Sequence, residues 1–165
     1  MSPSISLREI QPSDVPSIYF ESDPTYCAMA MIKPRTFEAF AAVWDKIFRD
    51  RASGAQPPGV TQRVILAPGP TGAEICGSIG CWMMGEQLAV GYGIARPHWG
   101  RGIASRALAL LLAEMPIRPL HARAAASNAA SVRVLTKNGF IPQRTEPAPE
   151  TDRYLACDEV SFLLA

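Results

Sequence analysis

The chain has 165 residues, of which 48% are hydrophobic and 19% charged, and its formal net charge at pH 7 is +1. This length suits one domain, residues 1–165, that buries about 70% of the surface exposed by the unfolded chain. The near-neutral charge argues against a nucleic-acid-binding surface, which is usually clearly basic. The sequence has no apolar run of about 18 residues, so we expect no membrane-spanning segment.

The cysteines and the first residues of the chain indicate the cellular compartment in which the protein is expected to work. The four cysteines (Cys27, Cys76, Cys81 and Cys157) form no CxxC pair, and the chain has only two histidines. This composition does not favour a zinc site, and we expect no bound metal. No basic segment followed by an apolar core opens the chain, so no secretion signal is expected. The sequence therefore predicts a cytoplasmic protein with reduced, mostly buried thiols.

The first 50 residues predict one strand and two helices. Residues 5–10 alternate in the manner of an edge strand. Ser13 or Asp14 is placed to cap a first helix, which the sequence Ser22-Asp23-Pro24 interrupts. A second helix is predicted from about residue 35 to residue 50, because apolar residues there recur at three- and four-residue spacing. These residues are Phe37, Phe40, Ala41, Trp44, Ile47 and Phe48.

The remaining elements follow in a regular order. Apolar runs separated by glycine and proline turns predict three consecutive strands joined by hairpins, over residues 60–67, 73–84 and 88–95. The chain is completed by an apolar helix (103–114), a strand (120–126), a helix (128–138, with Gly139 as the left-handed C′ residue) and a final hairpin (140–145 and 154–164). The order β-α-α-β-β-β-α-β-α-β-β predicts a mixed α/β domain on one central sheet.

The segment from Val90 to Glu114 is the most informative stretch. A short apolar strand ends at Arg96-Pro97, a glycine turn follows at Trp99-Gly100-Arg101-Gly102, and an almost wholly apolar helix begins at Ile103. Glycines allow positive φ and the close approach of a ligand to the backbone. The first turn of a helix has N–H groups without helical partners and carries partial positive charge. The segment therefore predicts a seat for a phosphate-bearing ligand.

Other ligands fit the spacing less well. A Walker P-loop needs a Gly-Lys pair, which the chain does not have. The dinucleotide fingerprint GxGxxG is nearly met from Gly100, but Ser105 takes the last glycine position. The acidic residue expected about 20 residues later is also missing from residues 120–126. A nicotinamide or flavin site is disfavoured, and a tight turn without a ligand is the remaining alternative.

Two segments resemble a known family. Trp99-Gly100-Arg101-Gly102-Ile103-Ala104 resembles the acetyl-CoA signature (Q/R)xxGx(G/A) of the GNAT N-acetyltransferases. Tryptophan in the first place is common in the Rim-type branch, which is named for enzymes that acetylate ribosomal-protein N-termini. Residues 128–140 (NAASVRVLTKNGF) resemble the NxxSxxxxxKxGF block of that branch, and residues 5–10, Asp14 and 22–24 resemble its N-terminal block. The resemblance covers nearly the whole chain and implies the GNAT fold, an α/β (α+β) domain with the order given above.

The resemblance implies how acetyl-CoA would be held. In the family, the strand before the glycine turn splays from its neighbour and pairs with the pantetheine arm, contacts that would fall to the main chain of Ile94 and Ala95. Asn128 and Ser131 match positions near the pantetheine and the sulfur, with helix capping and packing as their alternative roles. The pyrophosphate would be taken by amides of the turn, and the Arg101 side chain would add a charge contact or be solvated. The turn residues are Arg101, Gly102, Ile103, Ala104 and Ser105.

The implied reaction is direct transfer of an acetyl group from the thioester to an amine. Orienting two bound reactants supplies about 7–11 kcal/mol in such reactions. A main-chain N–H near Ile94 would stabilise the oxyanion. The attacking amine must be neutral, which is easier for an α-amine with a pKa of about 8 than for a lysine at about 10.4.

The catalytic side chains depart from the family pattern. Leu135 stands where many members have a tyrosine as general acid, and Ala89 stands where the Rim-type branch often has a glutamate. Ser131 matches the serine of the branch and is the best candidate acid. Glu86 or Tyr92 would relay a proton through water, although a solvated turn charge is the simpler role for Glu86. The cofactor is therefore better defined than the catalytic groups.

The acceptor is an amine that the sequence does not identify, either a protein N-terminus or a small molecule. Three acidic residues of the last hairpin would attract a cationic amine or simply be solvated. They are Glu146, Glu150 and Asp152. Several aromatic or apolar residues would belong to the core or would line an acceptor pocket. They are Tyr26, Met29, Phe37 and Phe40.

The expected partners are acetyl-CoA and an amine, with neither nucleic acid nor membrane, and a homodimer is left open. The alternative function is an acyl-CoA-binding module with little or no catalysis. Leu135 and Ala89, which replace family catalytic groups, favour that alternative.

Overall fold

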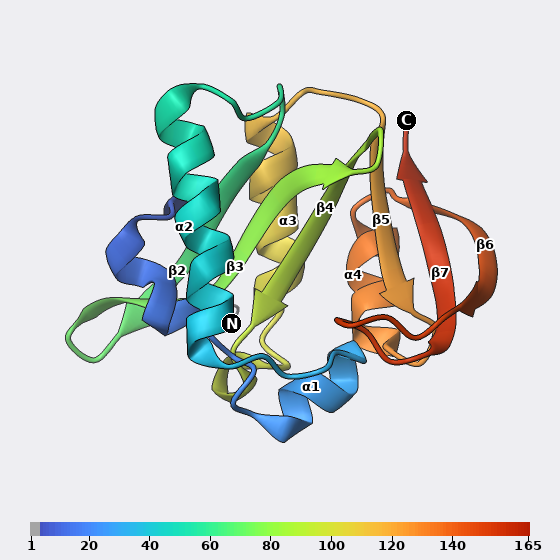
Figure 1. Ribbon diagram of the computed structural model, residues 1–165, viewed down its shortest axis with the longest axis horizontal. Coiled ribbons are helices and arrows are strands. Elements are labelled where there is room, and N and C mark those ends of the chain that lie inside the picture. Colours follow the sequence, from blue (N-terminus) through green and yellow to red (C-terminus); the bar gives the residue numbers. More distant parts are fainter. Residues whose placement is uncertain (1–3) are drawn as a thin grey trace.

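The computed structural model describes residues 4–165, whose elements are labelled in Figure 1. The strands are β1 (Ser6–Glu9), β2 (Thr61–Gly69), β3 (Gly72–Met84), β4 (Gln87–Ile94), β5 (Leu120–Ala125), β6 (Ile141–Ala148) and β7 (Cys157–Leu164). The α-helices are α1 (Pro24–Ala30), α2 (Phe37–Ser53), α3 (Ile103–Glu114) and α4 (Ala129–Lys137). Two 3-10 helices are η1 (Pro12–Ile18) and η2 (Arg96–His98).

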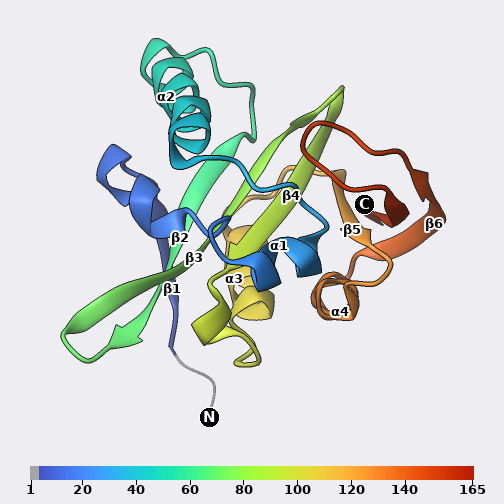
Figure 2. The same cartoon turned by 60° about the horizontal axis from the view of Figure 1, so that its bottom comes forward.

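The strands of the described residues form one seven-stranded sheet in the order β1-β2-β3-β4-β5-β7-β6. Neighbouring strands are antiparallel, except that β4 and β5 are parallel. Figure 2 shows α2 on one side of the sheet and α3 and α4 on the other. The predicted mixed α/β architecture on one central sheet is confirmed, including the three hairpin-linked strands that lead into the glycine turn.

The first predicted helix differs in kind. It is the 3-10 helix η1, which begins at Pro12, whereas the sequence suggested a cap at Ser13 or Asp14. The Asp14 carboxylate instead reaches back and accepts a hydrogen bond from the Gln11 N–H at 2.7 Å. Pro16 inside the segment has no N–H to donate, which disfavours a regular α-helix.

A short helix, α1, was not predicted. The sequence Ser22-Asp23-Pro24 indicates an interruption, but it also begins α1. The Asp23 carboxylate accepts a hydrogen bond from the Thr25 N–H at 2.9 Å, and Pro24 occupies the first helical turn, where its missing N–H would have no partner. Asp23 and Pro24 therefore start α1, whereas η1 has already ended at Ile18.

The two faces of the sheet pack against different helices. Leu108 and Leu111 of α3 belong to a buried cluster that also contains Leu135 of α4 and residues of β3, β4, β5 and β7. On the other face, Phe40 of α2 packs with η1 residues and with Val64 of β2. The buried carbon surface on both sides drives the layers together. No helix within residues 4–165 has the length and apolar character needed to cross a bilayer.

Candidate active site

A gap opens between β4 and β5. Within residues 4–165 the two strands share a single register pair, Ala89 with His121, and they diverge beyond it (Figure 1). The gap holds a small cavity of about 90 Å³. Its lining residues are Val90, Gly91, Tyr92, Ala122, Arg123, Ser131 and Leu135. Two parallel neighbours that separate in this way leave part of β4 without a strand partner on one side.

The ladder between β3 and β4 fixes which main-chain groups face this gap. Ala95 N–H donates to the Cys76 carbonyl at 2.9 Å, and hydrogen-bonded pairs alternate along an antiparallel ladder. The N–H groups of Tyr92 and Ile94 therefore point away from β3 and into the gap. The Ala95 carbonyl accepts from the His98 N–H at 2.9 Å, so both main-chain groups of Ala95 are engaged within the protein.

Tyr92 and Ser131, both proposed from the sequence, are brought together across the gap. The Tyr92 hydroxyl lies 2.9 Å from the Ser131 Oγ, and it also donates to the Ser131 carbonyl at 3.3 Å. Burial raises the pKa of Tyr92 to about 12, although the hydrogen bond to Ser131 lowers it in part. The phenol is therefore protonated at neutral pH and acts as a hydrogen-bond donor.

The glycine turn is shaped by two left-handed residues. Gly100 and Gly102 have φ of 74° and 73°, which favours glycine. Within residues 4–165 the N–H groups of Ile103, Ala104 and Ser105 find no acceptor, as expected for the first turn of α3. These three amides and the positive end of the helix dipole form a site suited to an anion.

Side-chain hydrogen bonds fix the glycine turn and the start of α4. Trp99 Nε1 donates to the Ile94 carbonyl at 2.7 Å and so fixes the turn against the end of β4. Because the Ile94 carbonyl already accepts this hydrogen bond, the free main-chain group of Ile94 that faces the gap is its N–H. The exposed Arg101 side chain lies 3.1 Å from His98 Nδ1. Asn128 caps α4, since its Oδ1 accepts from the Ser131 N–H at 3.2 Å.

Glu86 is not brought to this site. It lies exposed in the turn between β3 and β4, at the opposite end of β4 from Ile94. Tyr92 is six residues further on, about 20 Å along an extended strand. Ala89 and Leu135 are 4% and 1% exposed, so both replacements for family catalytic groups are buried apolar side chains.

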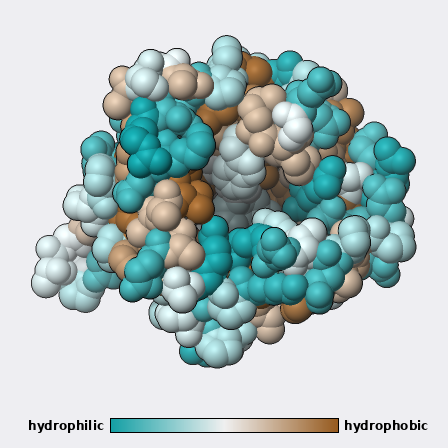
Figure 3. Space-filling view, viewed as in Figure 1, coloured by the Kyte–Doolittle hydropathy of each residue, from teal (hydrophilic) through white to brown (hydrophobic). Residues whose placement is uncertain are grey.

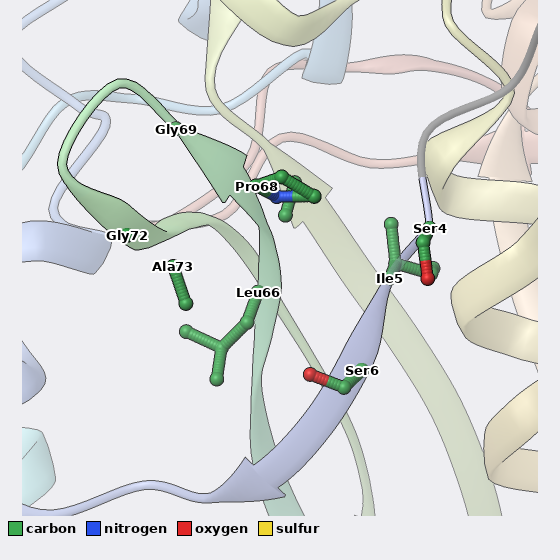
Figure 4. Close-up of a pocket in the computed structure, with 9 residues that line it drawn as sticks. Ser4, Ile5, Ser6, Leu66, Pro68, Gly69, Gly72 and Ala73 are labelled. Atoms are coloured by element: carbon green, nitrogen blue, oxygen red, sulfur yellow. The ribbon is translucent and has the colours of Figure 1, made fainter.

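A larger hollow lies elsewhere. Figure 4 shows it at the free edge of the sheet, between β1 and the hairpin of β2 and β3, with a volume of about 400 Å³. Its lining residues are Ser4, Ile5, Ser6, Leu66, Ala67, Pro68, Gly69, Gly72 and Ala73. None of these side chains is titratable, and β1 and β2 are separated from β4 by β3. This hollow therefore offers no chemistry to the β4–β5 gap.

The α2 side of the sheet is hollowed over β4 (Figure 3). Side chains alternate along a strand, and Tyr92 points toward α4, so Gly91 and Gly93 face this hollow. A β-carbon at Gly91 would come within 2.6 Å of the Trp82 ring, which is 46% exposed. The glycines let the Trp82 ring and the Tyr26 hydroxyl lie directly on the main chain of β4 on this face of the sheet.

Two segments far apart in sequence are tied together at this end of the molecule. Lys33 N–H donates to the Arg153 carbonyl at 2.8 Å, which joins the α1–α2 segment to the loop between β6 and β7. The Glu21 carboxylate is 4% exposed and lies 2.7 Å from Arg35 and 3.0 Å from Arg153. Burial raises the pKa of Glu21, but hydrogen bonds and charge from the two arginines outweigh it and hold the pKa below its usual value.

Glu21 could not be found by sequence reasoning, because its partners lie 14 and 132 residues away. The acidic residues that the sequence did single out are partly neutralised. Glu150 lies 3.3 Å from Lys33, and Glu146, which belongs to β6, lies 4.0 Å from Arg144. Pairing of this kind weakens the attraction that the loop would exert on a cationic amine.

Known proteins share this architecture. Residues 4–141 match the family model described as acetyltransferase (GNAT) domain. No curated protein shows a significant sequence match to the chain.

Solved structures agree over nearly the full length. An acetyltransferase (GNAT family) from Bacillus anthracis has a TM-score of 0.74 at 17% identity, covering 99% of this chain and 96% of its own. Spermidine N-acetyltransferase from Vibrio cholerae, in complex with CoA and spermine, has a TM-score of 0.70 at 16% identity, with 96% and 95% covered. The microcin C7 self-immunity acetyltransferase MccE, in complex with acetyl-CoA and AMP, has a TM-score of 0.74 at 13% identity, with 97% and 91% covered. At these identities the likeness is one of fold.

Proposed function

Because the chain belongs to the GNAT acetyltransferase family, we propose that it transfers the acetyl group of acetyl-CoA to a primary amine, by direct attack in a ternary complex. The observation that carries this proposal is the gap between β4 and β5, which leads from the N–H groups of Tyr92 and Ile94 to the unpaired amides at the start of α3. We take residues 1–165 as one N-acetyltransferase domain working in the cytoplasm, without a nucleic-acid or membrane partner.

The residues of the turn suit the diphosphate of coenzyme A. The amides of Ile103, Ala104 and Ser105 are free to donate within the described part of the chain, and Gly102 lets a ligand approach the backbone. The Arg101 side chain is exposed beside them and can turn toward added negative charge. For the pantetheine arm, the main chain of Tyr92 and Ile94 takes the role, since Ala95 is engaged with Cys76 and His98.

The N–H groups of Tyr92 and Ile94 also suit the oxyanion. Main-chain donors fixed in a sheet need no reorganisation as negative charge develops, and removing one such donor costs about 3–4 kcal/mol in well-studied enzymes. These main-chain N–H groups would therefore stabilise the transition state without help from a side chain.

The Tyr92–Ser131 pair serves the leaving sulfur by hydrogen bonding. A thiolate with a pKa of about 8.5 is a weaker base than the phenolate of Tyr92, whose pKa is about 12. Full transfer of the phenol proton is therefore uphill, and the pair stabilises the thiolate by donation until solvent protonates it. Asn128 holds Ser131 in place by capping α4.

Release of thiol from acetyl-CoA tests the proposal, with a panel that includes peptide N-termini, small amines and polyamines. Polyamines belong in the panel because the Vibrio cholerae neighbour carries spermine. A rising rate with at least one amine supports the transferase. An α-amine acceptor, as in the Rim-type branch, should be preferred over a lysine side chain near neutral pH because more of it is unprotonated.

An acyl-CoA-binding module with little catalysis is the second candidate. It is favoured by the buried Leu135 and Ala89, which leave the site without a family acid or base side chain at those positions. Calorimetric binding of acetyl-CoA without turnover of any amine would establish the module instead of the enzyme.

A further inference from the structure

The Tyr26 hydroxyl lies against the main chain of β4, on the face opposite the Tyr92–Ser131 pair. A β-carbon added at Gly93 would come within 2.3 Å of the Tyr26 hydroxyl oxygen. Gly93 stands between Tyr92 and Ile94, whose N–H groups face the gap. The hydroxyl therefore lies beside the part of β4 where the acetyl group is proposed to be held.

This hydroxyl is available to a ligand. Within residues 4–165 it makes no hydrogen bond. Because no fully buried side-chain oxygen or nitrogen in that part of the chain lacks a partner, the Tyr26 oxygen is not fully buried. Burial raises the pKa of Tyr26 to about 12, and the charge of Arg153 lowers it only in part. The phenol keeps its proton at neutral pH, and its oxygen lone pairs are free to accept.

The position of Tyr26 is fixed from several sides. Its ring packs on Phe20 with 5.4 Å between centroids. Asp23, the N-cap of α1, accepts a hydrogen bond from Arg96 Nε at 2.7 Å, and Arg96 follows β4 by two residues. Helix α1 is therefore tied to the end of β4, the strand that the hydroxyl contacts. Because the Tyr26 side chain is already held in place, little of its conformational entropy would be lost when an amine binds.

We infer that Tyr26 orients the attacking amine: its hydroxyl oxygen accepts a hydrogen bond from the amine N–H and turns the nitrogen lone pair toward the thioester carbon. The inference rests on the proposed acetyl transfer. In that step the C–N bond forms, the C–S bond breaks and its electron pair leaves on sulfur. The surplus amine proton goes to water, and Tyr26 neither gains nor loses a proton. The amine would thus be hydrogen-bonded by Tyr26 on one face of β4, and the sulfur by the Tyr92–Ser131 pair on the other face.

Steady-state kinetics on the full chain test this role. With the best amine of the panel, Tyr26→Phe should lower kcat about tenfold, the value of one hydrogen bond of about 1.4 kcal/mol made in the transition state. The KM for acetyl-CoA should stay within about twofold of wild type, because the hydroxyl lies on the other face of β4 from the Tyr92–Ser131 pair.

A double-mutant cycle tests the geometry without reference to activity. Gly93→Ala should lower Tm in wild type, because the new methyl group meets the Tyr26 hydroxyl. In the Tyr26→Phe background the loss should be smaller, since the next ring atom is 3.4 Å from the added carbon. An equal loss in both backgrounds would mean that the hydroxyl does not rest on Gly93, and the inference would fall.

The outcomes separate the two proposals. If wild type acetylates an amine and Tyr26→Phe has the same kcat, the role of Tyr26 is wrong and the transferase stands. If wild type acetylates nothing, the proposed function fails and the role of Tyr26 fails with it.

Discussion

Arg153 donates from both terminal guanidinium nitrogens to the carboxylate of Glu21, 132 residues earlier in the chain, at 3.0 and 3.1 Å. Arg35 donates to the same carboxylate at 2.7 Å. One buried acid thus joins the segment before α1, the segment before α2 and the loop between β6 and β7. These are the segments that border the proposed amine site.

Replacing Glu21 should destabilise the fold. In Glu21→Gln two arginines lose their counter-charge, and truncating one partner of a buried ion pair costs about 3–5 kcal/mol. We expect about 2 kcal/mol because Arg35 and Arg153 are 27% and 28% exposed and water reaches them. Urea unfolding measures the effect. Glu150→Gln, which removes an exposed partner of Lys33, is the control and should change stability by less than about 0.5 kcal/mol. Equal effects would contradict the ion cluster.

Stability should fall in acid, and Glu21 should contribute to the fall. The hydrogen bond from Arg8 lowers the pKa of Asp14, and the pKa of Glu21 is also lowered, against its burial, by Arg35 and Arg153. A carboxyl with a depressed folded pKa stabilises the protein above its unfolded pKa of about 4, and this stability is lost as pH falls through the folded value. Tm measured from pH 7 to pH 3 should therefore drop more steeply for wild type than for Glu21→Gln. Parallel curves would show that Glu21 is not linked to folding in this way.

Gly102→Val should weaken coenzyme A binding. Gly102 has φ of 73° at the start of α3, a conformation that costs a branched residue about 1–2 kcal/mol, so the turn would rearrange. We expect the Kd for coenzyme A, measured by calorimetry, to rise about tenfold or more, since about 1.4 kcal/mol corresponds to tenfold. Gly54→Val is matched to it, because Gly54 has φ of 75° at the end of α2 with open space around it. That control should lose stability but keep its affinity. Unchanged affinity in Gly102→Val would count against the phosphate seat.

Ser131→Ala and Tyr92→Phe should lower kcat by similar factors, about tenfold each, with a small effect on acetyl-CoA binding. The double variant should be little worse than either single one, because the two hydroxyls form one hydrogen-bonded unit at 2.9 Å. Ser127→Ala, an exposed serine just before α4, is the control and should match wild type. Additive losses in the double variant would indicate two independent roles, and no loss in Ser131→Ala would remove it from the mechanism.

Local sequence determined the elements that lead into the site. The glycine turn and the apolar residues after it define α3 as Ile103–Glu114, the predicted bounds. Gly139 takes the left-handed conformation expected of it, with φ of 88°. These features depend on residues within a few positions of one another, so spacing and residue type are enough to predict them. The same applies to the run of hairpin strands from β2 to β4.

Tertiary structure alone decided how these elements form a site. The separation of β4 from β5, the Tyr92–Ser131 contact, the ion pairs of Glu21 and the contact of Tyr26 with Gly93 join residues 14 to 132 positions apart. Such contacts follow from strand register, from which face of β4 each side chain occupies and from loops that close at a distance, none of which is set by near neighbours in sequence. For that reason the sequence by itself predicts the glycine turn before α3, whereas the Tyr92–Ser131 pair and the position of Tyr26 on β4 are set only by the folded sheet.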